Sequence, residues 1–421
     1  MIFLYRFLTF VFFPFFIIIT YFRKFKGKED KLRFKEKISV KETQLPENKK
    51  VIWMHAASIG ETNSILPLIK EIIKQDDKIF VLLTTTTFSS SQLIKKKKLN
   101  RNNFQHRFFT LDVKFLVNRF LNHWRPELVI FVDSEVWPNY LLEIAKRKIP
   151  LILINGRITM KTFKRWKAIP SFSRKIFSLY DLCLSSSKES EENLKSLGAK
   201  NVKYFGNLKF CPTNPNTDNI DNLKVSLNNN LIWCAASTHP GEEEIILNTH
   251  IKLKEKNKKV ITIIIPRHIS RSDEIFTLCE KFNLNGKIIN SFPEINNKNE
   301  VYIVNSIGEM TKYFYNCKSI FVGKSFSKKL IEVGGQNPLE PAKCGCKIYH
   351  GPFVSNFKEI YDFLKNKNIS HLVTDAVNLS EYLLKDFSDK TIDLKKNILE
   401  LDEYGNKILS LTTKEVLSFK K

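Results

Sequence analysis

The feature that most constrains the fold is a repeated alternation of short apolar runs with amphipathic stretches of helical period. In ILPLIKEIIK, for example, the apolar residues Ile65, Leu66, Ile69, Ile72 and Ile73 fall on one helical face. Near-continuous apolar runs separated by helices indicate parallel strands in βαβ units, because such strands are buried on both faces. We therefore expect strands at 51–54, 79–83, 128–132, 151–154 and 182–184, and again at 231–235, 260–265, 301–304, 319–322 and 347–349.

A chain of 421 residues is longer than one hydrophobic core usually supports, so we expect two domains of similar size. The stretch CPTNPNTDNIDN, which begins at Cys211, is rich in Pro, Asn and Asp and predicts a linker. We place the first domain at 35–210, the linker at 211–230 and the second domain at 231–421, with the last helix able to pack back on the first domain. The predicted class is α/β, with two doubly wound, Rossmann-like domains and a ligand-binding cleft between them.

The first 22 residues predict a membrane anchor helix. Residues 7–22, FLTFVFFPFFIIITYF, carry no charge, and the basic sequence RKFKGK follows at once. The small-residue cleavage site of a signal peptide does not occur there. We interpret residues 1–22 as a single anchor that spans a membrane or lies in its interface, with the domains that follow it on the cytoplasmic side. The alternative is a buried N-terminal helix of a soluble domain.

The net charge of +25 fits three kinds of partner: nucleic acid, an anionic membrane or an acidic substrate. A biased composition, rich in Lys, Asn, Ile and Phe, explains it equally well. Nucleic acid is not an expected partner, because aromatic and basic residues are not interleaved in any binding motif. The seven cysteines include no Cys-x-x-Cys pair, so we expect reduced, packed thiols in a cytosolic compartment and no metal site.

Polar motifs follow the predicted strands. They are HAASIGE, TTTT, DSEVWPN, NGR and GNLKF in the first half, and ASTHPGEEE, PRH, GEM and GGQNPLEP in the second. The carboxyl ends of parallel strands lie at one edge of a sheet, where α/β proteins bind their ligands. Nine motifs at such positions predict a functional site, and the lack of a Gly-rich dinucleotide or Walker loop argues against the usual nucleotide-hydrolysing or dinucleotide-binding mechanisms.

In combination, HAASIGE, SEVWPN, GNLKF, ASTHPGEEE, PRH and NPLEPA resemble the motifs of the 3-deoxy-D-manno-octulosonic acid (Kdo) transferases in order and spacing, up to about residue 362. The resemblance implies an inverting GT-B glycosyltransferase of lipopolysaccharide synthesis that uses no cofactor. Its donor would be CMP-Kdo, bound by the second domain. Its acceptor would be the lipid A precursor lipid IVA, bound by the first domain. A different GT-B enzyme, such as a lipid-linked glycosyltransferase or a sugar-nucleotide epimerase, is the alternative.

The resemblance also implies the catalytic residues. Glu61 would accept the proton of the acceptor hydroxyl, and Lys209 would stabilise the charge that grows on the departing CMP phosphate. Asp133 stands where the family usually has Glu, and Glu135 keeps a second carboxylate of the motif. From the residues alone, Glu61 could equally be a glutamate in the first turn of a helix, where the helix dipole favours the ionised form.

Further substrate-binding positions follow from the same motifs. Arg267 and His268 would meet phosphate or ribose, and Asn337 and Glu340 would meet ribose hydroxyls. The complete set beside the catalytic residues is Ser58, Gly60, Glu135, Ser237, Thr238, Arg267, His268, Ile307, Gly308, Glu309, Asn337, Pro338, Leu339 and Glu340. Besides Asp133, three residues depart from the family pattern, namely Asn305 for Asp, Lys324 for Gly and Gln336 for His.

A basic, apolar-rimmed face beside the anchor would let the enzyme work on anionic lipids of the inner membrane. Its expected residues are Lys24, Lys26, Lys28, Lys31 and Arg33. We expect the anchor to be separable, so that deletion of residues 1–22 weakens membrane association and leaves activity on a detergent-dispersed acceptor largely intact.

Overall fold

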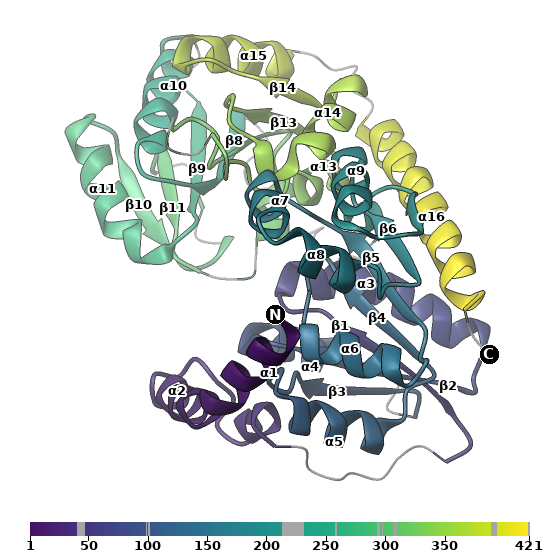
Figure 1. Ribbon diagram of the computed structural model, residues 1–421. Helices are drawn as coiled ribbons and strands as arrows, with labels where there is room; N and C mark the ends of the chain where they lie inside the picture. The colour runs from purple at the N-terminus through teal and green to yellow at the C-terminus, as the bar shows by residue number, and fades with distance from the viewer. Residues whose placement is uncertain are drawn as a thin grey trace. The chain divides into compact units, whose positions relative to one another are not determined.

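The computed structural model describes residues 1–39, 47–97, 99, 102–212, 231–256, 259–292, 295–296, 298–306, 308, 310–327, 329, 331–388 and 394–419 of the chain. Its contacts divide the chain into two compact units (Figure 1). Unit 1 comprises Met1–Thr213 and Tyr404–Lys421, and unit 2 comprises Asn214–Glu403. Residues 404–421, at the end of the expected second domain, thus belong to unit 1. Of the expected linker at 211–230, only residues 211 and 212 lie within the described residues.

Unit 1 is built on a seven-stranded parallel sheet with strand order β3-β2-β1-β4-β5-β6-β7. Its strands are β1 (Lys50–His55), β2 (Ile79–Thr85), β3 (Phe104–Phe108), β4 (Leu128–Val132), β5 (Leu151–Gly156), β6 (Leu182–Ser185) and β7 (Val202–Tyr204). Its helices are α1 (Ile2–Val11), α2 (Phe13–Phe25), η1 (Phe34–Lys37), α3 (Ile59–Gln75), α4 (Phe88–Lys96), α5 (Lys114–Trp124), α6 (Pro138–Lys146), α7 (Met160–Lys167), α8 (Pro170–Phe177), α9 (Lys188–Leu197) and η2 (Leu208–Phe210).

Unit 2 repeats this plan with a second parallel sheet, in the order β10-β11-β9-β8-β12-β13-β14. Its strands are β8 (Leu231–Thr238), β9 (Val260–Pro266), β10 (Gly286–Ile289), β11 (Val301–Val304), β12 (Ser319–Val322), β13 (Lys347–His350) and β14 (Ser370–Leu372). Its helices are α10 (Glu242–Lys256), η3 (Ile269–Arg271), α11 (Ser272–Lys281), α12 (Met310–Phe314), α13 (Leu339–Lys343), η6 (Ser355–Phe357), α14 (Lys358–Asn366) and α15 (Ala376–Ser388), and α16 (Leu394–Leu417) begins here and ends in unit 1.

The central strands are buried on both faces. Every residue of β2, β4, β5 and β9 is buried, as expected where helices cover both sides of a parallel sheet. The ten predicted strands are all present, and the predicted α/β class with two doubly wound units is confirmed. Four further strands escaped prediction, and each of them forms an edge of its sheet: β3, β7, β10 and β14.

The N-terminal apolar segment forms two helices in place of the expected single anchor helix. The helices α1 and α2 meet at Phe12 with a bend of 52°. Pro14, in the first turn of α2, explains the break, because proline has no N–H to donate and its ring clashes with the preceding turn. No single helix of the described chain is long and apolar enough to cross a membrane, whereas this bent pair passes that test of length and composition together.

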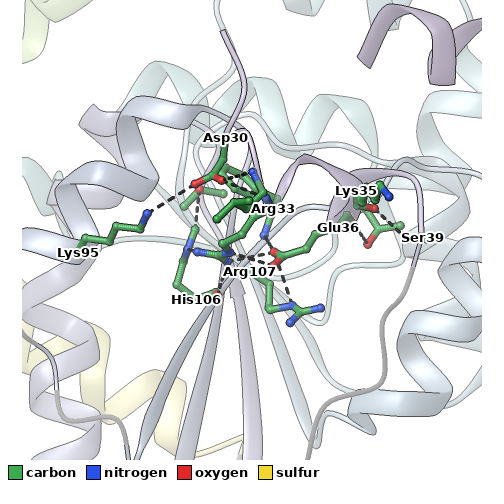
Figure 2. A network of polar contacts seen from close by, with 12 residues as sticks. Asp30, Arg33, Lys35, Glu36, Ser39, Lys95, His106 and Arg107 are labelled. Atoms are coloured by element: carbon green, nitrogen blue, oxygen red, sulfur yellow. Dashed lines mark hydrogen bonds and ion pairs between the residues drawn. The ribbon is translucent and has the colours of Figure 1, made fainter. Parts of the chain in front are cut away.

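The segment after α2 covers the free edge of β3. Figure 2 shows Arg33 lying between Glu36 and His106. The Glu36 carboxylate accepts a hydrogen bond from the Phe108 amide at 2.8 Å, and Arg33 donates to the His106 carbonyl at 2.7 Å. Backbone groups that an edge strand would otherwise present to solvent are therefore paired with side chains of η1 and its preceding turn. Arg33, expected on a membrane-facing surface, is part of this network.

The C-terminal part of α16 packs on the rest of unit 1. Lys203 of β7 pairs with Glu415 at 2.6 Å, and the Tyr404 ring meets Phe210 edge-on at 5.0 Å. Gly405 permits this approach, because a Cβ atom there would lie 2.2 Å from the Phe210 carbonyl oxygen. The helix thus holds η2, which carries the GNLKF motif, against unit 1.

Candidate active site

Each sheet has a switch point at which the chain changes the direction in which it adds strands, between β1 and β4 in unit 1 and between β8 and β12 in unit 2. Such switch points are where open α/β sheets bind ligands, because the loops on either side turn away in opposite directions. In unit 1 the HAASIGE motif follows β1 and the DSEVWPN motif follows β4. In unit 2 the STHPGEE motif begins with the last two residues of β8, and a loop beginning at Gly323 follows β12. The sequence motifs therefore flank both switch points.

Glu61 lies in the first turn of α3 and is held by the turn that precedes it. Ser58 is the N-cap residue, and its hydroxyl donates to Glu61 Oε1 at 2.7 Å. The Ala57 amide donates to Glu61 Oε2 at 2.7 Å. The Ser58 hydroxyl oxygen also accepts a hydrogen bond from the Glu61 amide at 3.4 Å, and this reciprocal capping of the helix by itself explains a glutamate at this position. Both carboxylate oxygens are thereby fixed in direction at the exit of β1.

The surroundings of Glu61 go beyond capping. Burial raises the pKa of its carboxyl, the hydrogen bond from Ser58 opposes that rise, and the negative charges of Asp133 and Glu135 add to it. Three carboxylates therefore gather at the switch point of unit 1. A carboxylate whose pKa is raised in this way is a better proton acceptor than an ordinary exposed glutamate.

Glu135 is held in its ionised form by its neighbours. Its Oε2 atom lies 3.0 Å from His55 Nε2 and accepts a hydrogen bond from Trp137 Nε1 at 2.6 Å. Burial alone would raise the pKa of Glu135, but the hydrogen bond and charge of His55, together with the Trp137 hydrogen bond, outweigh it and lower the pKa. The His55 ring stacks on Phe109 at 3.8 Å between centroids, so its position is fixed by packing.

Asp133 adopts a backbone conformation that is rare for a residue with a side chain. Its φ angle is +64°, and its amide donates to the Ile154 carbonyl at 3.0 Å. Left-handed residues other than glycine cost free energy and concentrate at functional sites. The Ser134 hydroxyl donates to Asp133 Oδ1 at 2.8 Å. The chain thus turns sharply after β4, and Asp133 lies at the carboxyl edge of the sheet.

Lys209 reaches the same site from η2. The Asn155 side chain, at the end of β5, accepts a hydrogen bond from the Leu208 amide at 3.0 Å and so holds η2 against the sheet. Burial lowers the pKa of Lys209, while the charges of Asp133 and Glu61 raise it and that of Arg157 lowers it. Lys209 therefore lies within electrostatic range of the two predicted catalytic carboxylates. A cation beside a general base is suited to stabilise negative charge that develops during transfer.

At the switch point of unit 2, the backbone at the end of β8 and the backbone after β12 lie close together. Ser237, the last residue but one of β8, has a φ angle of +57°, and Lys324, which follows β12, has a φ angle of +64°. Gly323, which precedes Lys324, packs closely against the end of β8, since a Cβ atom there would lie 2.6 Å from the Ser237 carbonyl oxygen. The buried Glu242 accepts hydrogen bonds from the amides of His239, Lys324, Ser325 and Phe326. It therefore ties the two loops together.

Cationic and imidazole side chains gather at this edge of unit 2. Burial lowers the pKa of His239, and the nearby Lys324, His268 and Arg267 lower it further, against a hydrogen bond with the Ser237 carbonyl. Burial and the charge of Arg267 likewise lower the pKa of Lys324. Side chains that depress one another's pKa in this way form a site for an anion, which would relieve their repulsion. The unusual Lys324 adds a positive charge to that site.

The NPLE motif is only partly accessible. Pro338 and Leu339 are buried, so their side chains pack in unit 2, and Asn337 Oδ1 accepts a hydrogen bond from the Leu339 amide at 3.2 Å. Glu340 is exposed, yet partial desolvation still raises its pKa, against the opposing charges of Lys343 and Arg267. Glu340 therefore stands within electrostatic range of the basic cluster and can meet hydroxyl groups of a ligand.

The remaining predicted positions differ in what the structure says of them. Ile307 and Glu309 lie outside the described residues. Gly308 is exposed with a φ angle of +91°. Thr238 Oγ1 is buried without a hydrogen-bond partner in the described part of the chain. Asn305 accepts a hydrogen bond from the Ser272 hydroxyl at 3.3 Å.

Sequence reasoning missed the residues that hold the site together. Five residues of the quoted motifs were assigned no role, namely His55, Asn155, Arg157, His239 and Glu242. Glu242 is one of three consecutive glutamates, and only the fold shows that it turns inward onto four amides. His55 precedes its partner Glu135 by 80 residues, so their pairing depends on β1 and β4 being neighbours.

Comparison with known proteins agrees with this architecture and these motifs. Residues 32–211 match the family described as 3-Deoxy-D-manno-octulosonic-acid transferase (kdotransferase). A 3-deoxy-D-manno-octulosonic acid transferase of Rickettsia bellii is 32% identical over 414 residues, which cover 96% of each chain. The corresponding transferase of Haemophilus influenzae is 30% identical over 321 residues, or 74% of this chain and 73% of the relative.

Solved structures show the shared fold at much lower identity. A putative UDP-N-acetylglucosamine 2-epimerase from Listeria monocytogenes has a TM-score of 0.59 at 12% identity, covering 87% of this chain and 96% of the other. A UDP-GlcNAc 2-epimerase from Neisseria meningitidis has a TM-score of 0.55 at 13% identity, covering 88% and 99%. These similarities concern the two-unit GT-B architecture alone. The motifs at both switch points and the near-complete alignment with the Rickettsia protein lead to one conclusion: the chain belongs to the Kdo transferase family of glycosyltransferases.

Proposed function

We propose that the enzyme transfers Kdo from CMP-Kdo to lipid IVA with inversion at the sugar. The observation that carries this proposal is the position of Glu61, fixed at the switch point of unit 1 beside Asp133 and Lys209. The family relationship indicates that the transferred sugar is Kdo. The carboxylates and the lysine of unit 1 support a role of that unit in the transfer, and the basic side chains of unit 2 support binding of the donor.

In this mechanism Glu61 accepts the proton of the attacking acceptor hydroxyl. The raised pKa of its carboxyl suits it to that step, and its two hydrogen bonds keep one orientation. Lys209 stabilises negative charge that develops on the leaving phosphate. Asp133 keeps Lys209 charged, because its own charge opposes the desolvation of the lysine.

The donor would bind at the carboxyl edge of unit 2. Arg267, His268 and Lys324 provide positive charge for the phosphate of CMP-Kdo, and Glu340 provides an acceptor for ribose hydroxyls. The buried residues of NPLE, such as Leu339, would contact the donor through their backbone groups.

The N-terminal helices would hold the enzyme on the cytoplasmic surface of the inner membrane. Phe3, Phe7, Ile18, Phe22 and Phe25 are all more than half exposed, and such apolar surface is expected to be buried in lipid. The exposed Lys26, Lys28 and Lys31 would face anionic headgroups, each contributing on the order of 1 kcal/mol. Because polar side chains of α1 are bonded to unit 1, an interfacial position is favoured over a span.

The test is an assay of the purified full-length protein with CMP-Kdo and lipid IVA. We expect Kdo to be transferred to lipid IVA and CMP to be released in equal amount. A UDP-sugar epimerase would instead convert its nucleotide sugar without an acceptor, so UDP-N-acetylglucosamine is the control substrate. Turnover of that control, with no Kdo transfer, would overturn the proposal.

A further inference from the structure

Asp112, in the loop between β3 and α5, lies at the N-terminus of α6, which begins at Pro138. Its Oδ2 accepts the Asn139 amide at 3.1 Å, its Oδ1 accepts the Tyr140 amide at 2.9 Å, and its carbonyl accepts from Asn139 Nδ2 at 2.6 Å. The first residue of α6 is Pro138, which has no N–H, and the N-cap residue Trp137 makes no side-chain cap. Asp112 therefore supplies the cap that α6 lacks.

The helix that Asp112 caps begins directly after the carboxylate loop, residues 133–137. Trp137, at the junction, donates to Glu135 and packs on Phe109 with 5.3 Å between ring centroids. Phe109 also stacks on His55, the other partner of Glu135. The start of α6 and the Phe109–Asp112 loop thus set the position of Glu135.

The N-terminal helix α1 contacts the same place from outside. The Tyr5 hydroxyl donates to Asp112 Oδ2 at 2.7 Å. Arg6 Nη2 pairs with the buried Glu143 of α6 at 2.8 Å. Thr9 Oγ1 lies 3.4 Å from Asn139 Nδ2. The three residues of α1 that carry polar groups on their side chains therefore all contact α6 or the aspartate that caps it.

We propose that Tyr5 and Asp112 are positioning residues, through which the membrane-facing helix α1 sets the carboxylate loop for transfer. The inference rests on the proposed function. When α1 is seated, Asp112 is aligned by Tyr5 and holds the start of α6, and the loop that carries Asp133 and Glu135 has one conformation. When α1 is displaced, the cap of α6 loses a partner and the loop loosens. The enzyme is thereby coupled to the surface on which its acceptor lies.

The experiment compares Tyr5→Phe with Tyr21→Phe in the full-length enzyme. Both changes remove one hydroxyl from the N-terminal helices and keep the apolar ring, but Tyr21 packs on Phe34 and does not contact Asp112. With detergent-dispersed lipid IVA, we expect Tyr5→Phe to lower kcat about three- to tenfold, the range that loss of one hydrogen bond supports. The KM for CMP-Kdo should stay unchanged, and Tyr21→Phe should match the wild type.

Hydrogen exchange provides a second readout that does not depend on turnover. The peptide covering residues 133–142 should exchange faster in Tyr5→Phe than in the wild type or in Tyr21→Phe, at unchanged global melting temperature. Asp112→Asn, which cannot accept both amides, should increase exchange in the same peptide. Equal kcat in Tyr5→Phe and Tyr21→Phe would overturn the positioning role, and so would unchanged exchange in Tyr5→Phe. If the wild type transfers no Kdo, the proposed function is wrong. The exchange data alone then show whether Tyr5 of α1 affects the carboxylate loop.

Discussion

At the scale of single residues, the site depends on how its carboxylates are made different from one another. Glu61 and Glu135 lie near each other, but burial and neighbouring negative charge raise the pKa of Glu61. Hydrogen bonds from His55 and Trp137 lower that of Glu135. Two carboxyls pushed apart in this way are suited to separate tasks, one to take up a proton and one to remain charged.

The first prediction removes the proton acceptor. Glu61→Gln keeps the shape of the side chain but cannot accept a proton, so we expect kcat to fall by roughly a hundredfold or more while CMP-Kdo still binds. Glu71→Gln on the same helix is the matched control and should leave kcat unchanged. Steady-state kinetics and donor titration measure the two quantities. Near-normal turnover of Glu61→Gln would remove Glu61 from the mechanism.

The second prediction follows from the hydrogen bond of Ser58 to Glu61. That bond lowers the pKa of Glu61, so Ser58→Ala should raise it further. A base must be ionised to act, so activity is lost as the pH falls through its pKa. We expect the acid limb of the kcat profile to move to higher pH in Ser58→Ala, with most of kcat recovered on the alkaline side. An unshifted limb would assign it to another group.

At the scale of elements, the edges of the sheets are where structure and sequence pattern diverge. The three middle residues of β3 (FQHRF) are only partly buried. All three residues of β7 are also only partly buried. An edge strand has neighbours on one side only, so it needs fewer apolar residues and lacks the continuous apolar run of a central strand. The pairing of β3 with η1 side chains replaces the missing neighbour (Figure 2).

The third prediction tests that replacement. Glu36→Ala leaves the Phe108 amide without its carboxylate acceptor and removes the ion pair between Arg33 and Glu36. We expect the free energy of unfolding to fall by about 2–4 kcal/mol, as for other broken, largely buried polar contacts. The neighbouring exposed Lys35→Ala is the control and should change it by less than about 0.5 kcal/mol. Urea unfolding followed by circular dichroism gives both values, and equal midpoints would mean that η1 does not stabilise β3.

At the scale of the whole molecule, the N-terminal helices are part of unit 1 and not an appendage. Besides the contacts of α1 with α6, Lys37 donates to Glu29 at 2.5 Å and to the Thr86 carbonyl at 2.7 Å. Arg23 of α2 pairs with the same Glu29 at 2.7 Å. The segment up to Lys37 is therefore joined to unit 1 at several buried polar groups. Together with the contacts of α1, this leads us to predict that residues 1–22 cannot be removed without loss of activity, in contrast to the expectation of a separable anchor.

The fourth prediction distinguishes anchoring from positioning. Deletion of residues 1–22 removes Tyr5 and Arg6, so we expect it to lower activity on detergent-dispersed lipid IVA at least as much as Tyr5→Phe does. Phe3→Ser with Phe25→Ser changes two side chains that are each 83% exposed. It should weaken sedimentation with anionic vesicles and leave the detergent activity unchanged. A truncated enzyme with full activity in detergent would restore the separable anchor.

Much of the fold could be predicted because central parallel strands carry a local pattern. β2, β4 and β9 are buried throughout and mostly apolar, since each is covered on both faces, and the apolar residues of the helices between them recur with a period of about 3.6 residues. The break of the N-terminal segment was missed, although Pro14 offered a sequence indication of it. The motifs singled out Glu61, Asp133 and Lys209, and the structure brings these three residues within electrostatic range of one another, while their catalytic roles stay predictions.

By itself, the sequence determined which residues end the strands, and so which polar groups could share an edge. Only the tertiary structure decided which of them meet. His55 and Glu135 are 80 positions apart, and Tyr5 and Asp112 are 107 apart. Their contacts depend on the strand order and on the seating of α1. A side chain's burial and the charges around it set its pKa, and both are properties of neighbours brought together by folding. A local apolar pattern indicates that a strand is buried on both faces. The partners of a buried polar group lie in other segments of the chain, so the local sequence around that group does not indicate them.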